Sequence, residues 1–433
     1  MAGPDIDRSR RSFLVTAVAI GGSIGLSACL GSESAPDIPQ GTADPASAPE
    51  RQHAWNDVLR TDDHGNHVPP RHRVLLLLDL QQGGPPDEAA GETVETALRS
   101  LERAYERSPA GLLFTIGYSP AYFDRFEVGM PAGIDLPDPR ALAPFEDPAV
   151  DRPDAVLHLA SDHAEAVLGA EEALRGNEAT ANGVTMDAHL GEVFEVVERR
   201  TGFIGEGLPQ EHADAGGIPD SAPMPEDAPM FMGFKSGFPH SQASEDRVTI
   251  EAGTFAGGTT QQLSRLVLHL DQWYEQDSRY HREASMFCPH LAQQDAIEGD
   301  GSNLGDTGGV QRCPAHSDDA LGETATQEGI VGHSEKMLRA RDEDGPRLLR
   351  RDFNSTDDGR AGLHFLSLQE RIADFVAVRE AMNGTDLADS TPVGQRTNNG
   401  ILQYFDVESR GNYLLPPRRL RALPTPRGVP DQG

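Results

Sequence analysis

The stretch that decides the fold runs from Gly233 to Arg351 and consists of short motifs separated by longer connections. In chain order the motifs are Gly233-Phe234-Lys235-Ser236-Gly237, Gly253-Thr254-Phe255, Gly258-Thr259-Thr260-Gln261-Gln262, Leu266-Val267-Leu268-His269-Leu270-Asp271-Gln272-Trp273 and Leu348-Leu349-Arg350-Arg351. The apolar run from Val267 to Leu270 predicts a strand, and Leu348-Leu349 predicts another that ends at Arg350. Glycines at 233 and 237 are typical of a tight turn.

Upstream of this stretch, strand-like and helix-like segments alternate. The continuous apolar run Val74–Leu80 predicts a strand, and residues 88–107 carry apolar or small side chains at helical spacing. Strands at 111–118 and 155–160 and a helix at 162–174 follow. This order predicts the split β-α-β arrangement of a ferredoxin-like half-domain.

Downstream, the pattern predicts a second set of elements. Residues 291–330 are polar, glycine-rich and aperiodic, and indicate a long loop or insertion. A strand at 363–368 leads into a helix at 369–382. Tyr404-Phe405 and Tyr413–Pro417 then close the domain.

These motifs, together with Thr115-Ile116-Gly117-Tyr118-Ser119-Pro120 and Phe123-Asp124, resemble the dye-decolorizing (DyP-type) haem peroxidases over most of residues 71–425. The resemblance implies an α+β fold with two ferredoxin-like half-domains, of the dimeric α/β-barrel superfamily. It also implies a haem b cofactor, with hydrogen peroxide and a small-molecule electron donor as partners, and a tendency to form homo-oligomers. The haem would be noncovalent, because the chain has no Cys-x-x-Cys-His attachment motif.

The expected domain boundaries follow from these patterns and from composition. They are a twin-arginine signal with lipobox at 1–29, a disordered linker at 30–70, an N-terminal half at 71–202, an irregular connection at 203–232 and a C-terminal haem-binding half at 233–425.

His333 is the candidate axial ligand to haem iron, and so the candidate metal-binding residue. Its segment resembles the family's histidine segment, although the usual Asn-Pro is missing, and Arg350 follows 17 residues later, close to the family interval. Haem iron needs a neutral imidazole on its proximal side. His269 and His364 are rivals, but both sit among apolar residues, where core packing explains them better.

Arg350 is the candidate distal arginine, and it would stabilise negative charge on the peroxide oxygen. Arg351 is the alternate, and Asn354 could add a polar distal contact. The family's distal aspartate, at the fourth place of Gly-x-x-Asp-Gly, is replaced by Ser236, which has no useful basicity. Asp246 is the alternative carboxylate, but it fits better as a loop residue. Gly233 and Gly237 would let the backbone approach the haem.

Cys288 and Cys313 form a second constellation with His290 and His316. Outside the cell two cysteines usually oxidise, and a disulfide closing about two dozen residues would add about 3 kcal/mol of stability. The alternative is a Cys₂His₂ site for zinc or copper. The histidine spacings are unlike those of common zinc fingers, so the sequence favours the disulfide.

The N-terminus carries a predicted export signal. Ser9-Arg10-Arg11-Ser12-Phe13-Leu14 is a twin-arginine signal, and the apolar run after it is too short for a dedicated membrane span. Leu26-Ser27-Ala28-Cys29 resembles a lipobox, which predicts a lipid-modified Cys29 and anchoring at the extracytoplasmic face of the membrane. The alternative is an ordinary cleaved signal with a chance cysteine.

The net charge of −32 bears on partners and environment. It repels nucleic acid and anionic surfaces, so neither is an expected partner. Only two lysines, Lys235 and Lys336, stand among 37 basic residues, against 69 carboxylic ones. This balance resembles that of proteins from salt-loving archaea, and it predicts that high salt is needed to screen self-repulsion.

Three functions are consistent with the sequence. The first is an extracytoplasmic haem peroxidase with His333 as axial ligand and Arg350 on the distal side. The second is a non-catalytic haem-binding or haem-trafficking lipoprotein, in which Ser236 marks a lost proton relay. The third is a member of the fold without cofactor, whose Cys/His loop serves as its own metal or interaction site. His333 and Arg350 argue against the third, and Ser236 weakens the first.

Overall fold

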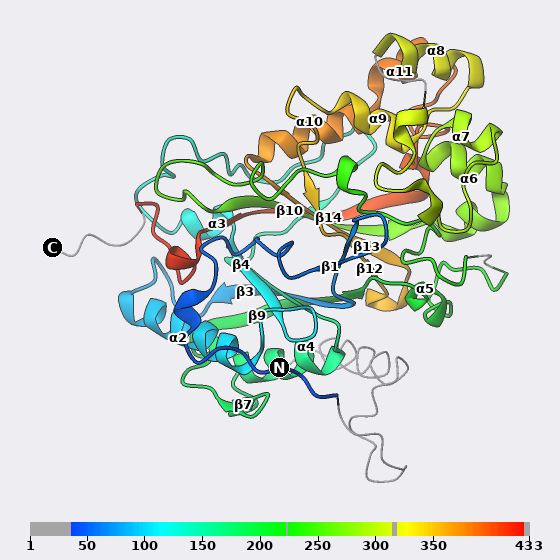
Figure 1. Ribbon diagram of the computed structural model, residues 1–433. Coiled ribbons are helices and arrows are strands. Elements are labelled where there is room, and N and C mark those ends of the chain that lie inside the picture. The colour runs from blue at the N-terminus through cyan, green and yellow to red at the C-terminus, as the bar shows by residue number, and fades with distance from the viewer. Residues whose placement is uncertain (1–35, 222–223, 314–317, 428–433) are drawn as a thin grey trace.

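The N-terminal half of the protein is a four-stranded antiparallel sheet with two helices on one face. The computed structural model describes residues 36–221, 224–313 and 318–427 (Figure 1). The half follows the order β3 (His72–Leu80), α2 (Glu88–Ala104), β4 (Leu113–Tyr118), β6 (Ala155–Ser161), α4 (Ala164–Leu174) and β9 (Phe194–Phe203). The strands lie in the order β9-β3-β6-β4, which is the ferredoxin-like arrangement.

Strand β3 is apolar along its whole length because both of its faces are buried. Leu76 and Leu78 pack with the helices α2 and α4, whereas Leu75 and Leu77 face a second core shared with the C-terminal half. A strand covered on both sides reads as a continuous apolar run rather than an alternating one. This is why the run was easy to recognise in the sequence.

The C-terminal half repeats the arrangement with a large insertion. Its strands are β10 (Thr259–Leu268), β11 (Leu349–Arg350), β12 (Phe353–Ser355), β13 (Gly362–Gln369) and β14 (Phe405–Leu415). They lie in the order β14-β10-β13-β12, with β11 also paired to β13. Helix α10 (Ile372–Asn383) connects β13 to β14. Two ferredoxin-like halves in an α+β fold are therefore confirmed.

The insertion between β10 and β11 is helical. It contains a π-helical turn (Gln272–Gln276) followed by α6 (Arg279–Met286), α7 (Pro289–Gln293), α8 (Asp318–Glu328) and α9 (His333–Arg339). These helices gather with α11 (Thr385–Ser390) at one end of the molecule, and α2 and α4 cover the other end (Figure 1).

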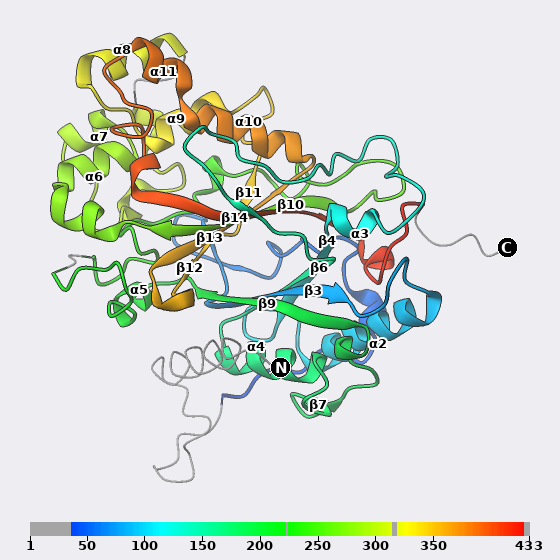
Figure 2. The same cartoon turned by 180° about the vertical axis from the view of Figure 1, so that it is seen from behind.

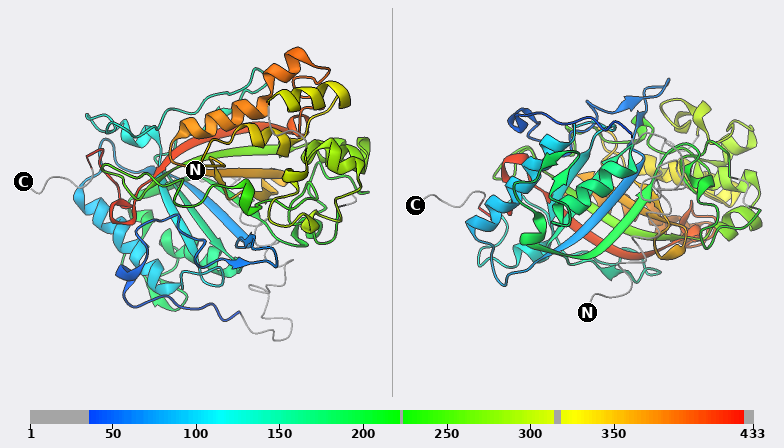
Figure 3. Two further views of the ribbon diagram at one scale, coloured as in Figure 1. Left: turned by 45° about the horizontal axis from the view of Figure 1, so that its top comes forward. Right: turned by 90° about the horizontal axis from the view of Figure 1, so that it is seen from below.

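The two half-sheets join at both edges. Asn354 of β12 pairs with Phe203 of β9, and Leu414 of β14 pairs with Tyr118 of β4. Since β14 also pairs with β10, the strands return to their starting point and enclose the shared core (Figure 3). The connection between α3 (Pro120–Phe123) and β5 (Ala149–Val150) crosses from the N-terminal half to α10 (Figure 2), where Asn383 Nδ2 donates to the carbonyl of Leu142 at 2.6 Å.

Three expectations need correction. Residues 36–70 do not form a disordered linker: a 3₁₀ turn (Pro45–Ser47) and the pair β1 (Arg60–Thr61) and β2 (His67–Val68) pack on the domain, where Trp55 is only 2% exposed. The segment 291–330, expected to be a long loop or insertion, contains the helix α8. Only two described residues of α8 are buried, so its sequence shows little of the apolar periodicity of a helix. Strand β10 begins earlier than expected, at Thr259, because its Thr and Gln side chains are buried inside the sheet.

The twin-arginine segment, Cys29 and His316 lie outside the described residues. Within the described part of the chain, no helix combines the length and the apolar character needed to cross a membrane.

Candidate active site

A large cavity lies within the C-terminal half, between the sheet and the helices α9 and α10. Its empty volume is about 1670 Å³ including the open mouth. The lining is mainly apolar and includes five of the nine methionines in the chain: Met230, Met232, Met286, Met337 and Met382. Such side chains adapt to the shape of a flat ligand.

The charged lining of the cavity is predominantly basic. Its charged residues, leaving histidine aside, are Lys235, Arg341, Arg350, Arg379, Arg410 and a single carboxylic residue, Asp352. This reverses the balance of the chain, which carries almost two acidic residues for every basic one. The cavity therefore suits a ligand that is apolar over most of its surface and carries negative charge at its edge.

His333 lines this cavity from the first turn of α9. Burial lowers the pKa of its imidazole to about 3, and the nearby cations of Lys336, Arg350 and Arg379 act in the same direction. The ring is therefore neutral at ordinary pH, as a metal-binding imidazole must be.

The backbone holds the start of α9 tightly. A Cβ on Gly332 would overlap the carbonyl oxygen of Phe287, so a side chain cannot fit there. On the other side Gly400, with φ +61°, would place a Cβ 3.2 Å from the Cα of His333. One turn later, the buried ammonium of Lys336 donates to Met382 O, Asn399 O and Asn399 Oδ1 at 2.6, 2.9 and 2.7 Å. These contacts fix the direction in which His333 projects.

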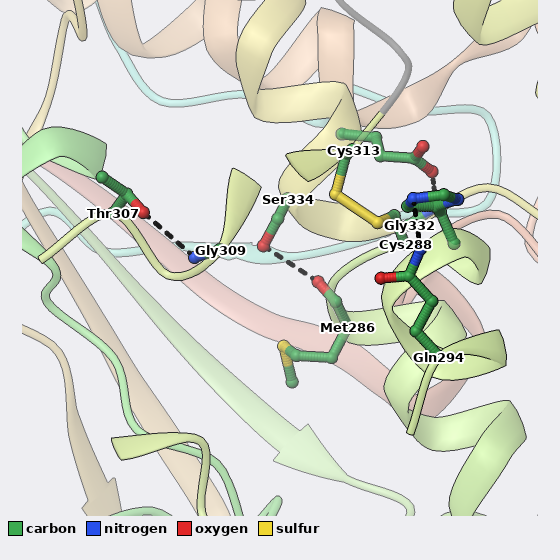
Figure 4. The surroundings of a disulfide bond; sticks show 10 residues. Met286, Cys288, Gln294, Thr307, Gly309, Cys313, Gly332 and Ser334 are labelled. Atoms are coloured by element: carbon green, nitrogen blue, oxygen red, sulfur yellow. Dashed lines mark hydrogen bonds between the residues drawn. A yellow bond between two sulfur atoms is a disulfide. The ribbon is translucent and has the colours of Figure 1, made fainter. Parts of the chain in front are cut away.

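Cys288 and Cys313 are joined by a disulfide, with their Cα atoms 6.3 Å apart. The bridge lies beside the start of α9, where Gly332 N donates to the Glu335 carboxylate at 2.8 Å (Figure 4). Ser334 Oγ also donates to Met286 O at 3.0 Å across the same junction. No group of three or more potential metal-binding side chains occurs among residues 36–221, 224–313 and 318–427.

Arg350 and Arg351 point in opposite directions because they follow each other along an extended segment. Arg350 lines the cavity, and its Nε is buried without a hydrogen-bond partner. Arg351 is buried on the other side, where it lies 4.2 Å from the ring centre of Trp55 and 3.0 Å from Glu245 Oε1. Arg350, not its neighbour, is therefore available to a ligand.

The second residue after Arg350 is Asp352, which the sequence analysis missed. It lines the same cavity, and its Oδ1 accepts a hydrogen bond from Leu366 N at 3.2 Å. Burial raises the pKa of this carboxyl to about 6, against the opposing effects of Arg350, the Leu366 amide and Arg73. The available signal was the i, i+2 spacing from Arg350, which puts both side chains on one face of an extended strand.

Ser236 also lines the cavity, but its flanking glycines do not. Gly233 and Gly237 have φ of +78° and +84°, so they shape the turn that presents Phe234, Lys235 and Ser236. The expectation that the two glycines contact a cofactor stays a prediction, and in this structure they act by shaping the turn.

Asn354 lines the same cavity, and its side chain also makes structural hydrogen bonds, so its distal role stays a prediction. Its Oδ1 accepts from Phe231 N at 2.9 Å, and its Nδ2 donates to Phe203 O and Pro229 O at 3.2 and 3.0 Å. These bonds use both amide N–H donors and attach the loop carrying Ser236 to the sheet edge, while Oδ1 can accept a second hydrogen bond.

The rivals to these residues lie away from the cavity. His269 Nε2 is 2.9 Å from Asp406 Oδ2 near the surface, and buried His364 Nε2 is 3.1 Å from Asp357 Oδ2. Asp246 forms an ion pair with Arg51 and its side chain is 84% exposed, so it is a loop residue.

The N-terminal half contributes one carboxylate behind the cavity wall: Glu146 is not on the lining itself, but it pairs with two arginines that are. Glu146 binds Arg379 at 2.6 Å and Arg410 at 3.1 Å, and all three side chains are almost fully buried. Burial would raise the pKa of Glu146, but the two arginines reverse this and hold it below its usual value. Two cations against one anion leave this wall positive. Sequence patterns gave no sign of this cluster, because its members lie far apart in the chain.

The class of protein can now be stated: the molecule has the fold of the DyP-type peroxidases. DtpA from Streptomyces lividans, solved as an oxyferrous complex, matches with a TM-score of 0.55 and 19% identity, over 91% of this chain and 96% of that one. The encapsulated DyP-type peroxidase from Mycobacterium smegmatis matches with a TM-score of 0.53 and 16% identity, over 87% and 99%. A variant of DypB from Rhodococcus jostii in complex with haem gives 0.53 and 16%, over 85% and 97%.

A sequence-family model also matches the chain, and it defines a smaller group than the proteins that share the fold. The chain belongs to DUF7405, described as a family of unknown function, whose model matches residues 70–417. No curated protein matches the chain in sequence.

Proposed function

We propose that the protein is a haem-dependent, peroxidase-like oxidoreductase that oxidises small donors with hydrogen peroxide. The observation that carries the proposal is the joint presence, in one large cavity, of the neutral imidazole of His333 and the unpartnered Nε of Arg350. The DyP-type fold and the haem-bound structures that share it support the same function.

The residues present fit haem b held without a covalent bond. His333 would bind the iron, the methionines and phenylalanines would pack on the porphyrin faces, and the basic lining would bind its carboxylates. When bound, the haem supplies the iron centre at which peroxide is reduced and from which donors are oxidised. Arg350 would orient peroxide and stabilise the negative charge that develops on its oxygen.

The test is the visible spectrum of the full chain folded with haem in high salt. Wild type is expected to show a strong Soret band, and His333→Ala is expected to lose most of it because no other imidazole lines the described cavity. His269→Ala is the matched control, since it removes an imidazole that pairs with Asp406 outside the cavity. An unchanged band in the His333 variant would refute His333 as ligand.

Ser236 favours a second candidate, a haem-binding or haem-trafficking protein without peroxidase activity. In this proposal Ser236 occupies the family's aspartate position, and a serine cannot act as a general base. The two candidates differ in one measurement on the haem-loaded protein. A rapid spectral change after mixing with peroxide supports the peroxidase, and a stable spectrum supports the carrier.

We also propose export by the twin-arginine route and anchoring at the extracytoplasmic face of the membrane through lipid on Cys29. The sequence Leu26-Ser27-Ala28-Cys29 supports this. In the native host, Cys29→Ser should move the protein from the membrane to the soluble fraction. A variant that stays entirely in the membrane fraction would refute the lipid anchor.

A further inference from the structure

We propose that Asp352 is the carboxyl group that moves the peroxide proton in this protein, taking the part that Ser236 cannot play. The inference rests on the proposed haem-peroxidase function and adds a residue to it. It starts from the fact that Asp352 is the sole carboxylic residue on the described lining of the cavity.

The strand geometry brings the carboxyl and the guanidinium to the same wall. Arg350 ends β11, Asp352 immediately precedes β12, and the residue between them turns towards Trp55. Both outer side chains line the cavity, yet they form no ion pair with each other within 4.0 Å. Asp352 and Arg350 are therefore placed to contact the same small ligand.

Both groups keep bonding capacity for such a ligand. The hydrogen bond from Leu366 N at 3.2 Å uses Oδ1 of Asp352, and the described residues give Oδ2 no hydrogen-bond partner. The Nε of Arg350 is likewise unpartnered. Leaving the buried Arg350 Nε without a partner is costly, and a bound ligand would remove that cost.

The electrostatics agree with the geometry. With its pKa raised to about 6 by burial, the carboxyl can exist in either protonation state near neutral pH. A general base that later acts as an acid works best when its pKa lies near the working pH.

The proton transfers balance without a further reactant. The Asp352 carboxylate accepts the proton from one oxygen of hydrogen peroxide and then returns it to the other oxygen. The O–O bond would then break and the second oxygen would leave as water, while bound haem would supply the two electrons that the cleavage needs and retain the first oxygen. The carboxylate ends as it began.

A purely structural role for Asp352 makes a different prediction. Its carboxyl binds the Leu366 amide where the pairing of β11 and β12 with β13 is interrupted, so it could serve only to complete the sheet. Asp352→Asn separates the two roles, because the amide oxygen still accepts that hydrogen bond but cannot take up a proton.

The experiment measures cyanide binding to the haem-loaded wild type, Asp352→Asn and Asp352→Glu by stopped flow from pH 4.5 to 8. Hydrogen cyanide must lose its proton to bind ferric iron, so a base in the cavity accelerates binding without turnover. We expect the Asn variant to bind cyanide about a hundredfold more slowly, with a normal Soret band, and to lose the inflection near pH 6. The Glu variant should recover part of the rate.

The outcomes are distinct. Haem-loaded Asp352→Asn with wild-type rates and pH profile would show that Asp352 only supports the sheet, and the proposed function would stand. A wild type without an inflection near pH 6 would overturn the inference even if the Asn variant failed to fold. A wild type that cannot bind haem would overturn both proposals.

Discussion

Stability and chemistry make opposing demands on Asp352. Its folded-state pKa is about 6, above the usual 3.8 of an aspartate, so the folded chain holds the proton more tightly than the unfolded chain. Stability therefore falls as pH rises from about 4 to about 6, and the cost is complete above that range. A carboxyl retained at such a cost is expected to serve the site.

Asp352→Asn is expected to stabilise the haem-free protein at pH 7 and to leave its stability at pH 4 nearly unchanged. Two pKa units correspond to about 3 kcal/mol, and because Asp352 is only partly buried and faces the cavity we expect about 1–2 kcal/mol. Denaturant unfolding at the two pH values measures the difference. An equal gain at both would mean that charge is not the cause.

Ser236→Asp is expected to restore peroxide reaction in the Asp352→Asn background. Both side chains line one cavity, so a carboxylate at either position can reach a ligand held near Arg350. We expect the double variant to react with peroxide at least tenfold faster than Asp352→Asn alone. The rate is read from the spectral change after mixing with peroxide. Ser241→Asp, also on the lining and next to Arg350, whose Nη2 donates to Ser241 Oγ at 3.5 Å, tests whether the position of the added carboxyl beside Arg350 matters. Equal recovery from both would indicate an unspecific effect of charge.

At the scale of the elements, the position of α9 decides how His333 is presented. Gly332→Ala should push the helix away from Phe287, lower the free energy of unfolding by about 1–3 kcal/mol and weaken haem binding roughly tenfold. Gly322→Ala in α8 is the matched control: no atom lies within 4 Å of its added Cβ, so helix propensity should stabilise the protein by up to about 1 kcal/mol. Haem titration and denaturant unfolding check both. Unaltered haem affinity in the Gly332 variant would contradict this role of α9.

The elements also show what the sequence could predict. The β3–α2–β4 and β6–α4 segments were recognised because their burial is local and periodic. Strand β10 was predicted only at its apolar end, since Gln261 and Gln262 are buried by neighbouring strands that no local pattern reveals. His333, Arg350 and Ser236 could be proposed from spacing. The Glu146–Arg379–Arg410 cluster could not, because it forms only when the N-terminal half folds over α10.

At the scale of the whole molecule, two electrostatic terms respond differently to salt. The net charge of −32 produces long-range repulsion, which salt screens over about 10 Å at 0.1 M. Buried groups are screened much less. The response of stability to pH at high salt therefore isolates the buried groups, and among these the histidines bind protons near neutral pH only when the chain unfolds.

Acid is expected to unfold the protein even in high salt, starting below about pH 6.5. Burial lowers the pKa of His53 to about 3 and of His72 to about 4, and it also lowers the pKa of His158 and His364. Each folded-state pKa lies below the unfolded value, so the unfolded chain binds more protons between the two. Stability is thus complete above about pH 6.5 and is lost as pH falls towards 4. The shifts of His53 and His72 each correspond to a few kcal/mol, which is comparable with a typical stability of about 5–15 kcal/mol.

Denaturant unfolding from pH 8 to 4 in molar salt measures this loss. Protonation of surface carboxylates reduces the net negative charge over the same range, which by itself would stabilise the folded chain. The two effects have opposite signs, so the measurement decides between them. If stability stays constant or rises as pH falls from 6.5 to 4, self-repulsion dominates the energetics of this molecule and the buried histidines do not. If it falls, and falls equally at two high salt concentrations, the buried imidazoles set the acid limit.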